Sequence, residues 1–152
     1  MGLEKEIFQK KFRNDAHRLE VNIIYTFNWL YAFHSSFLKP FKITPQQFNV
    51  LRILRGQHPL PASVKLIRDR MLDKMSDASR IVEKLRVKGF IERKVCPNDR
   101  RACDVVITEK GMKLLSKIDF ASSSFDELFS SLSQSDIKQM NTLLDKIREY
   151  KK

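Results

Sequence analysis

The chain has 152 residues, enough for one domain with a hydrophobic core, and its 42% hydrophobic content excludes wholesale disorder. Its net charge of +11 favours a polyanionic partner, either nucleic acid or an anionic membrane surface. Residues 42–101 hold 15 Lys and Arg against 6 Asp and Glu, so +9 of the +11 lies there. This concentration of charge favours a nucleic-acid footprint over an evenly solvated surface.

Two cysteines, Cys96 and Cys103, are too few for a disulfide scaffold. No run approaches the ~20 apolar residues of a membrane-spanning helix, and the mixed-charge N-terminus is unlike a signal peptide. The sequence therefore predicts a soluble, cytoplasmic protein with no membrane partner, in which both thiols stay reduced. A cross-strand disulfide that acts as a redox switch is the alternative, because the two cysteines bracket one predicted hairpin loop.

A long helix is predicted over residues about 4–38. Aromatic and aliphatic side chains recur there at three- and four-residue steps, no Gly or Pro interrupts the run, and Pro40 ends it. The apolar stripe is too long for one small domain to cover, so a second copy of the chain is its simplest partner. Tyr25, Trp29 and His34 on this helix could line a ligand pocket, although such a stripe is more often core.

The basic segment begins with two shorter helices. Thr44, Pro45 and Gln47 form a capping box with proline at the first helical position, and Gly56 should end this helix. Ser63 can cap the second helix.

A third helix, from Ser76 to its stop at Gly89, precedes two predicted strands, Phe90–Val95 and Cys103–Ile107. The turn between the strands carries Asp99-Arg100-Arg101. A helix followed by a basic-tipped hairpin is typical of a winged helix, whose helix fits a DNA major groove and whose hairpin tip fits a minor groove. The predicted fold class is therefore mainly α with a small β-hairpin wing.

The C-terminal part is predicted to be helical again. Thr108 can cap a helix that the serines at 122–124 weaken, and Ser133 with Asp136 in the first turn marks the start of the last helix.

With these elements in place, the chain resembles the MarR family of bacterial transcriptional regulators over nearly its full length. The resemblance implies a single 1–152 domain, with a winged helix-turn-helix lobe over about 42–108 and dimerisation helices over about 4–38 and 109–150. It also implies a homodimer, often a repressor released by a small-molecule effector such as a phenolic compound. The matching residues are Ser79-Arg80, Val82, Leu85, Lys88-Gly89, Glu92-Arg93, Asp99-Arg100-Arg101, Ile107-Thr108 and Gly111.

Two positions depart from the family pattern. Leu72 stands where the family often has Gly in the turn before the recognition helix, so this turn must be built without a left-handed glycine. Asp77 stands where Thr or Ser is usual near the start of that helix. Its carboxylate could accept from a cytosine amino group, but we favour a cap that also suits the helix dipole.

Candidate DNA contacts follow from the same resemblance. Arg101 is the first choice, because a wing arginine can enter the minor groove while Asp99 holds its guanidinium and Arg100 meets phosphate. Arg80 lies one turn into the recognition helix, where major-groove side chains sit. The other candidates carry hydroxyl or ammonium groups that could meet phosphates or bases: Ser63, Lys65, Ser76, Ser79 and Lys84. For Ser76 and Ser79, the two serines of the recognition helix, a capping role is the open alternative.

No enzyme constellation is visible, since His17, His34 and His58 have no triad or ligand spacing and two cysteines alone make an incomplete metal site. We therefore expect neither enzyme activity nor a metal or cofactor. The predicted function is sequence-specific binding of double-stranded DNA by a homodimeric, ligand-responsive transcriptional repressor that reads a near-palindromic operator. The alternative is a winged-helix interaction module whose basic face binds an acidic protein. The Asp-Arg-Arg wing argues against it, because a protein partner needs no groove-reaching tip.

Overall fold

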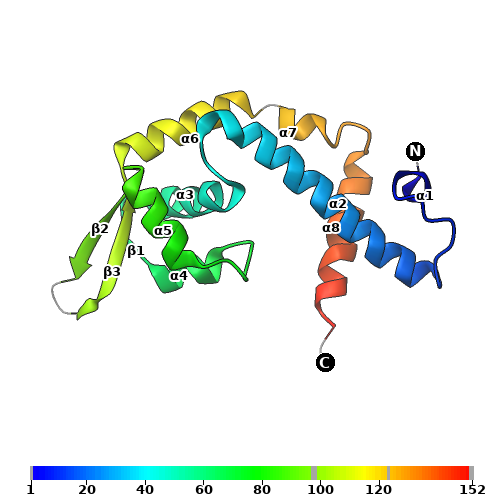
Figure 1. The fold of residues 1–152 in the computed structure, drawn as a ribbon, viewed down its shortest axis with the longest axis horizontal. Coiled ribbons are helices and arrows are strands. Elements are labelled where there is room, and N and C mark those ends of the chain that lie inside the picture. The colour runs from blue at the N-terminus through cyan, green and yellow to red at the C-terminus, as the bar shows by residue number, and fades with distance from the viewer. Residues whose placement is uncertain (1, 97–98, 123, 151–152) are drawn as a thin grey trace. The chain divides into compact units, whose positions relative to one another are not determined.

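The computed structural model describes residues 2–96, 99–122 and 124–150, and the side chains of residues 95–103 and 124 are not among those described. The fold is mainly α with one small antiparallel sheet, which confirms the predicted fold class (Figure 1). The chain divides into two compact units, Met1–Leu115 and Ser116–Lys152. The elements in chain order are α1 (Leu3–Glu6), α2 (Asp15–Leu38), the 3-10 helix η1 (Lys39–Phe41), α3 (Pro45–Gln57), β1 (Ala62–Ser63), α4 (Val64–Arg70), α5 (Ala78–Val87), β2 (Ile91–Cys96), β3 (Asp99–Ile107), α6 (Glu109–Ala121), α7 (Ser124–Glu127) and α8 (Gln134–Arg148).

The predicted single N-terminal helix is wrong, because α1 ends at Glu6 and α2 begins only at Asp15. The side chain of Asn14 accepts the His17 N–H at 2.9 Å and caps α2, so a local polar contact starts a new helix inside the apolar run. Phe8, between the two helices, has a φ of 54°, outside helical geometry. An Arg18–Glu4 ion pair of 2.6 Å joins α1 to α2.

The sheet has the order β1-β3-β2, with Ala62 opposite Val105 and Ile91 opposite Ile107. The sequence did not predict β1, because two residues are too few to show an alternating pattern. β3 begins at Asp99, four residues before its predicted start, so the expected placement of Asp99-Arg100-Arg101 in the turn is also wrong.

The register does not place the two cysteines opposite each other. The Cα partner of Cys103 is Val95 and that of Cys96 is Asp99, across an irregularity between Val95 and Cys96. Their side chains lie outside the described residues, so both the predicted reduced thiols and the alternative disulfide stay untested.

The core of the first unit lies among α3, α4, α5 and the sheet, which pack against one another. Each element turns its apolar face inward. The fully buried side chains of these elements are Val50, Leu51, Leu54, Ile67, Val82, Leu85, Ile91 and Val105. This core fixes which faces of α5 and of the hairpin remain available to a partner.

Three of the predicted helix starts are confirmed by side-chain caps. Thr44 and Gln47 form the capping box of α3, Ser63 accepts the Leu66 N–H at 3.1 Å, and Ser133 with Asp136 forms a second capping box on α8. The end of α3 differs from its prediction, since the helix continues through Gly56 to Gln57. The helix predicted after Thr108 ends at Ala121, where the Ser122 hydroxyl donates to the Asp119 carbonyl at 2.7 Å.

Gly111 in α6 offers a test of the contact between this helix and the end of α5. A Cβ at Gly111 would lie 2.4 Å from the Phe90 carbonyl oxygen, so the backbone must move to accept a methyl group. We expect Gly111→Ala to lower the free energy of unfolding by about 1–3 kcal/mol in urea denaturation. Gly56→Ala is the matched control, because its Cβ would meet only Arg70 Nη2 at 4.0 Å. Helix propensity alone should stabilise the control by about 0.5–1 kcal/mol, and equal effects of the two substitutions would contradict the contact.

Candidate nucleic-acid interface

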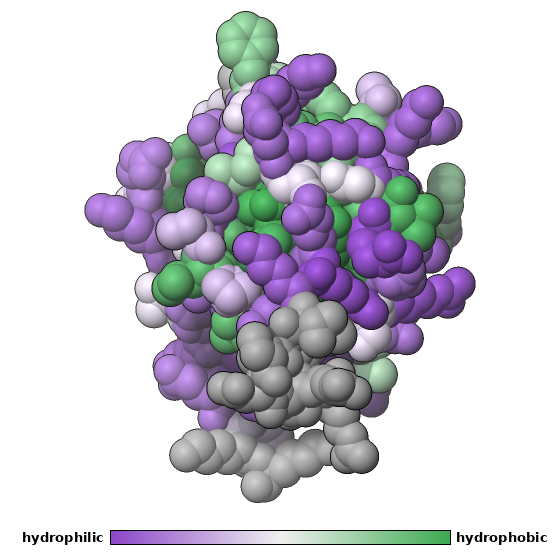
Figure 2. All heavy atoms as spheres, turned by 90° about the vertical axis from the view of Figure 1, so that its left-hand side faces the viewer, coloured by the Kyte–Doolittle hydropathy of each residue, from purple (hydrophilic) through white to green (hydrophobic). Residues whose placement is uncertain are grey.

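The outward face of α5 is polar and largely exposed to solvent. Ser79, Arg80 and Lys84 are exposed, whereas Ala78, Val82 and Leu85 on the opposite face are buried. Figure 2 faces the side on which β2 and β3 lie in Figure 1, and it shows hydrophilic side chains over most of that surface with smaller apolar areas between them. The structure therefore presents these three predicted residues together on one helix.

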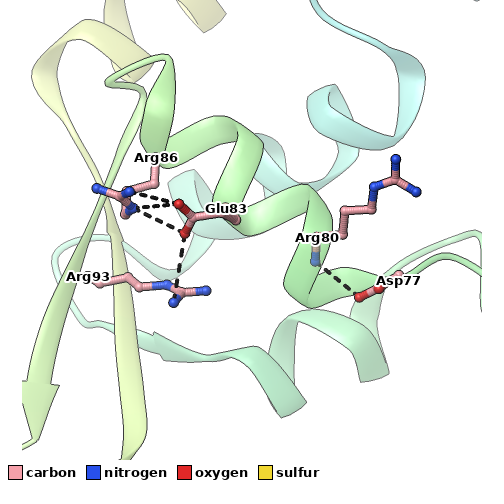
Figure 3. A network of polar contacts seen from close by, with 5 residues as sticks. All are labelled: Asp77, Arg80, Glu83, Arg86 and Arg93. Carbon is pink, nitrogen blue, oxygen red and sulfur yellow. Dashed lines mark hydrogen bonds and ion pairs between the residues drawn. The ribbon is translucent and has the colours of Figure 1, made fainter.

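The arginines near α5 differ in what holds them (Figure 3). Glu83 accepts from Arg86 at 2.7 Å and lies 3.8 Å from an Arg93 guanidinium nitrogen, so it partly neutralises both. The bond from Arg86 is the main reason that the pKa of Glu83 falls below its usual range. Arg80 points away from this cluster, and its guanidinium meets no partner among the described residues. Arg80 is thus the α5 arginine left able to bind an anion.

Asp77 caps α5, as the sequence analysis favoured. Its carboxylate accepts the Arg80 N–H at 3.0 Å, and the helix begins one residue later, at Ala78. Because α5 begins at Ala78, the predicted start at Ser76 is two residues too early. A capping carboxylate is engaged with the backbone, which makes its use on a cytosine amino group less favourable.

The turn before α5 is built from side-chain hydrogen bonds instead of a glycine. Asn49 of α3 accepts the Leu72 N–H at 2.9 Å, and Asp73 accepts the Met75 N–H at 3.0 Å and the Ser76 hydroxyl at 2.5 Å. The Ser76 hydroxyl is the main cause that lowers the pKa of Asp73, followed by the Met75 N–H. Ser76 therefore helps to build the turn and does not fill the capping role that the sequence left open for it, because the N-cap of α5 is Asp77.

The start of α4 carries two further candidates. Ser63 accepts the Leu66 N–H, which leaves its own hydroxyl proton able to donate to a phosphate oxygen. Lys65 lies 3.3 Å from Asp69, in an exposed pair of the kind that contributes little to stability.

Lys88, at the end of α5, has a structural role that the sequence did not indicate. Its ammonium donates to the Lys42 carbonyl at 2.6 Å and to Gln47 Oε1 at 3.0 Å, which ties α5 to the start of α3. Burial lowers its pKa, and the charge of Lys84 adds to this effect.

The wing candidates are placed only through their backbone. Asp99, Arg100 and Arg101 begin β3, and their side chains lie outside the described residues. Whether Asp99 holds the Arg101 guanidinium therefore stays a prediction. On β2, Arg93 and Lys94 are exposed and extend the basic surface from α5 along the hairpin.

A pocket of about 300 Å³ lies where α2 and η1 meet the start of α3. It presents ammonium and hydroxyl groups beside apolar atoms. Its lining residues are Tyr31, Ser35, Lys39, Lys42, Ile43, Thr44 and Pro45. Tyr25, Trp29 and His34 do not line it, so their role in a ligand pocket remains a prediction. Tyr25 instead donates to Glu6, and burial lowers the pKa of His34.

The described part of the chain contains no cluster of three or more His, Cys, Asp or Glu side chains that could hold a metal ion. It also contains no helix with the length and hydropathy needed to cross a membrane.

The three helices α3, α4 and α5 with the hairpin β2–β3 define a winged helix-turn-helix protein. A family model described as MarR family matches residues 41–102. The HTH-type transcriptional regulator MhqR of Bacillus subtilis (strain 168) is 34% identical over 109 residues, which cover 69% of this chain and 72% of that protein. The chain belongs to the MarR family, as its motifs indicated.

Solved structures share this fold. A putative MarR-like transcription regulator from Bacillus cereus ATCC 10987 matches with a TM-score of 0.78 and 20% identity, over 89% of this chain and 96% of that chain. A mutant MarR from E. coli complexed with operator DNA matches with a TM-score of 0.75 and 23% identity, over 91% of this chain and 99% of that chain. At these identities the likeness concerns the fold alone.

The cap on α5 can be tested by changing Asp77. Asp77→Ala removes the acceptor for the Arg80 N–H, and we expect a loss of about 0.5–2 kcal/mol in the free energy of unfolding. Asp77→Asn keeps an acceptor at the same place and should stay close to the wild type. The measurement is urea denaturation of all three proteins. Equal stability of Asp77→Ala and the wild type would show that the carboxylate is not a cap.

Proposed function

We propose that this protein is a transcriptional regulator that binds double-stranded DNA in a sequence-specific manner. The main observation behind this proposal is the exposed face of α5. Arg80, Lys84 and Ser79 project there from a helix whose opposite face is buried. Such a helix has the width and the donor groups for a major groove. The membership of the family and the operator-DNA complex of a MarR with the same fold both support this proposal.

We infer that each half-site is read by one lobe. Arg80 supplies the main contact to base edges, Lys84 and Lys65 meet phosphates, and the hydroxyls of Ser63 and Ser79 position the lobe on the backbone. Arg101 at the hairpin reaches the minor groove, with Asp99 as its orienting partner and Arg100 on phosphate. In this reading Asp77 and Ser76 shape the start of the helix and do not read bases.

The protein is proposed to act as a homodimeric repressor in the cytoplasm, without enzyme activity. In a single chain, α2 exposes Leu19, Ile24 and Phe27, and α8 exposes Leu143 and Ile147, an amount of apolar surface that a second copy would cover. Two lobes on one dimer must meet both half-sites at once. A ligand that changes the separation of the two α5 helices would therefore release the DNA.

The lining of the pocket supports an effector with an acidic or hydrogen-bond-accepting group. Lys39 and Lys42 offer positive charge, while Tyr31 and Thr44 offer hydroxyl donors.

The rival proposal, a winged-helix module for an acidic protein, predicts no preference for any DNA sequence. Selection from a random pool of duplex DNA separates the two functions, since only a regulator enriches a defined site.

Arg80→Ala should weaken binding to the selected operator by about 1–3 kcal/mol, because it removes the unpaired guanidinium of the recognition helix. Arg86→Ala is the matched control on the same helix, since Glu83 already holds that guanidinium, and its effect should be smaller. Fluorescence anisotropy with labelled operator gives both affinities. A larger loss for Arg86→Ala than for Arg80→Ala would reverse the assignment.

Arg101→Ala should also weaken operator binding by about 1–3 kcal/mol while the circular dichroism spectrum stays unchanged. The reason is that a wing arginine in a narrow minor groove binds a strongly negative potential and contributes little to the fold. Wild-type affinity of this variant would remove Arg101 from the interface.

The dimer is expected to select a near-palindromic site whose half-site centres lie about 10 base pairs apart, one turn of the double helix. Light scattering at micromolar concentration should give twice the mass of the 17.9 kDa chain. A monomer under these conditions, or a selected site without inverted symmetry, would contradict the dimer.

A further inference from the structure

Two side chains of α3 hold the two ends of the recognition helix α5. Asn49 Oδ1 accepts the Leu72 N–H at 2.9 Å in the turn before α5. Lys88, the residue directly after α5, donates from its ammonium to Gln47 Oε1 at 3.0 Å. Residues two positions apart lie about 200° apart around a helix axis, so these two bonds leave α3 on different sides. The helix α5 is therefore tied to α3 at two separate points.

The bond at the C-terminal end of α5 is well supported. Gln47 is 4% exposed, and its Oε1 also accepts the Thr44 N–H at 3.3 Å in the capping box of α3. The Lys88 ammonium donates in addition to the Lys42 carbonyl at 2.6 Å. Both acceptors of Lys88 are uncharged oxygens at or just before the start of α3. This ammonium is thus engaged inside the lobe, whereas that of Lys84 on the same helix is exposed.

At the N-terminal end, hydrogen bonds within the turn connect the Asn49 bond to the first turn of α5. Asp73 accepts the Met75 N–H at 3.0 Å and the Ser76 hydroxyl at 2.5 Å. Asp77 then caps α5. The chain from the Asn49 bond to the helix start is therefore held by side-chain hydrogen bonds.

The apolar packing between these two points does not by itself fix the direction of α5. Helices α3 and α5 pack against each other, and their fully buried side chains are aliphatic: Val50, Leu51, Leu54, Val82 and Leu85. Apolar burial is not directional, and the crossing angles of packed helices scatter by about 15–20° around their preferred values. A hydrogen bond accepts only a narrow range of distance and angle. One such bond at each end of α5 restricts the direction that the packing leaves open.

We propose that Lys88 and Asn49 are positioning residues, which set the direction of the recognition helix across α3 by holding its two ends. The proposal rests on the proposed DNA-binding function. Lys88 contributes to DNA recognition through this geometry, and its ammonium does not meet phosphate. Because β2 begins three residues after Lys88, the same bond also fixes where the hairpin leaves the lobe.

A comparison of two lysines tests the role of Lys88. Lys88→Met and its matched control Lys84→Met each remove one positive charge and nearly keep the length of the side chain. Affinities for the selected operator and for a random duplex of equal length are measured at one salt concentration. Lys88→Met should lower the ratio of operator to random affinity about fivefold or more, because a misdirected helix loses its alignment with base edges. Lys84→Met should weaken both affinities together, because a lost phosphate contact acts uniformly across sequences.

The same ratio separates positioning from a purely structural role. A contact that only stabilises the fold would leave both affinities of the folded Lys88→Met protein at wild-type values. A phosphate contact would lower both and leave the ratio unchanged. An unchanged ratio in Lys88→Met, with either pattern, would overturn the proposal.

Asn49 is tested by a pair of substitutions at one position. Asn49→Leu removes the acceptor of the Leu72 N–H and should also lower the affinity ratio. Asn49→Asp keeps an oxygen at that place and should retain the wild-type ratio, although its added negative charge weakens both affinities. Equal ratios for the two variants would overturn the proposal at this end of the helix.

A second arm uses the free protein and needs no DNA. Residual dipolar couplings of the backbone N–H groups report the orientation of α5 relative to α3 in the folded molecule. In Lys88→Met and in Asn49→Leu, the couplings of α5 should no longer fit its wild-type orientation relative to α3. Lys84→Met and Asn49→Asp should retain that orientation. A loss of stability alone does not change the orientation of α5 in molecules that remain folded.

Lys88→Leu and Asn49→Ala replace Lys88→Met and Asn49→Leu if those variants do not fold. Wild-type couplings of α5 in both the Lys88 and the Asn49 variants would overturn the proposal. A wild-type protein without affinity for DNA would contradict only the proposed function, because the couplings still decide whether the two bonds set the direction of α5.

Discussion

The position of the recognition helix relative to the wing depends on how α5 ends. Gly89 adopts a φ of +75°, and the Phe90 N–H returns to the Leu85 carbonyl at 3.1 Å, so the chain reverses within two residues and enters β2. The Thr108 hydroxyl donates to the Gly89 carbonyl at 2.8 Å and accepts the Gly111 N–H at 3.1 Å. One hydroxyl thereby joins the end of α5 to the start of α6. The hairpin and the helix leave this junction in directions fixed by its hydrogen bonds.

The same junction explains why basic residues near α5 have different roles. The carbonyl groups at the end of a helix carry partial negative charge, and cations are favourable there. Lys110 donates to the Lys88 carbonyl at 2.7 Å, and Lys88 itself reaches the Lys42 carbonyl, so both lysines stabilise the lobe. Arg86 and Arg93 share Glu83. Fewer basic side chains of residues 42–101 are therefore available to a polyanion than the net charge of this segment suggests. Arg80 and Lys84 of α5 are among those that are available.

The turn before α5 shows how a departure from the family pattern is accommodated. A left-handed glycine would satisfy the turn by backbone conformation alone. With Leu72 in its place, the chain uses Asn49 and Asp73 to hold backbone and side-chain groups that the turn exposes. The consequence is a turn that is tied to α3 by the Asn49 side chain.

The sequence by itself determined the elements whose signals are local. Thr44, Ser63, Asp77, Gly89 and Thr108 act on atoms within about four residues, and the structure confirms each as a helix start or stop. Local competition also explains the errors, because the Asn14 cap interrupts an apolar pattern that alone would continue as one helix. Only the tertiary structure decided β1, the neutralisation of Arg86 and Arg93 by Glu83, the pocket beside Tyr31 and the bond between Gln46 and Tyr31. These depend on residues far apart in the sequence, as between Ala62 of β1 and Val105 of β3, and no periodicity or cap signal encodes which distant residues will meet.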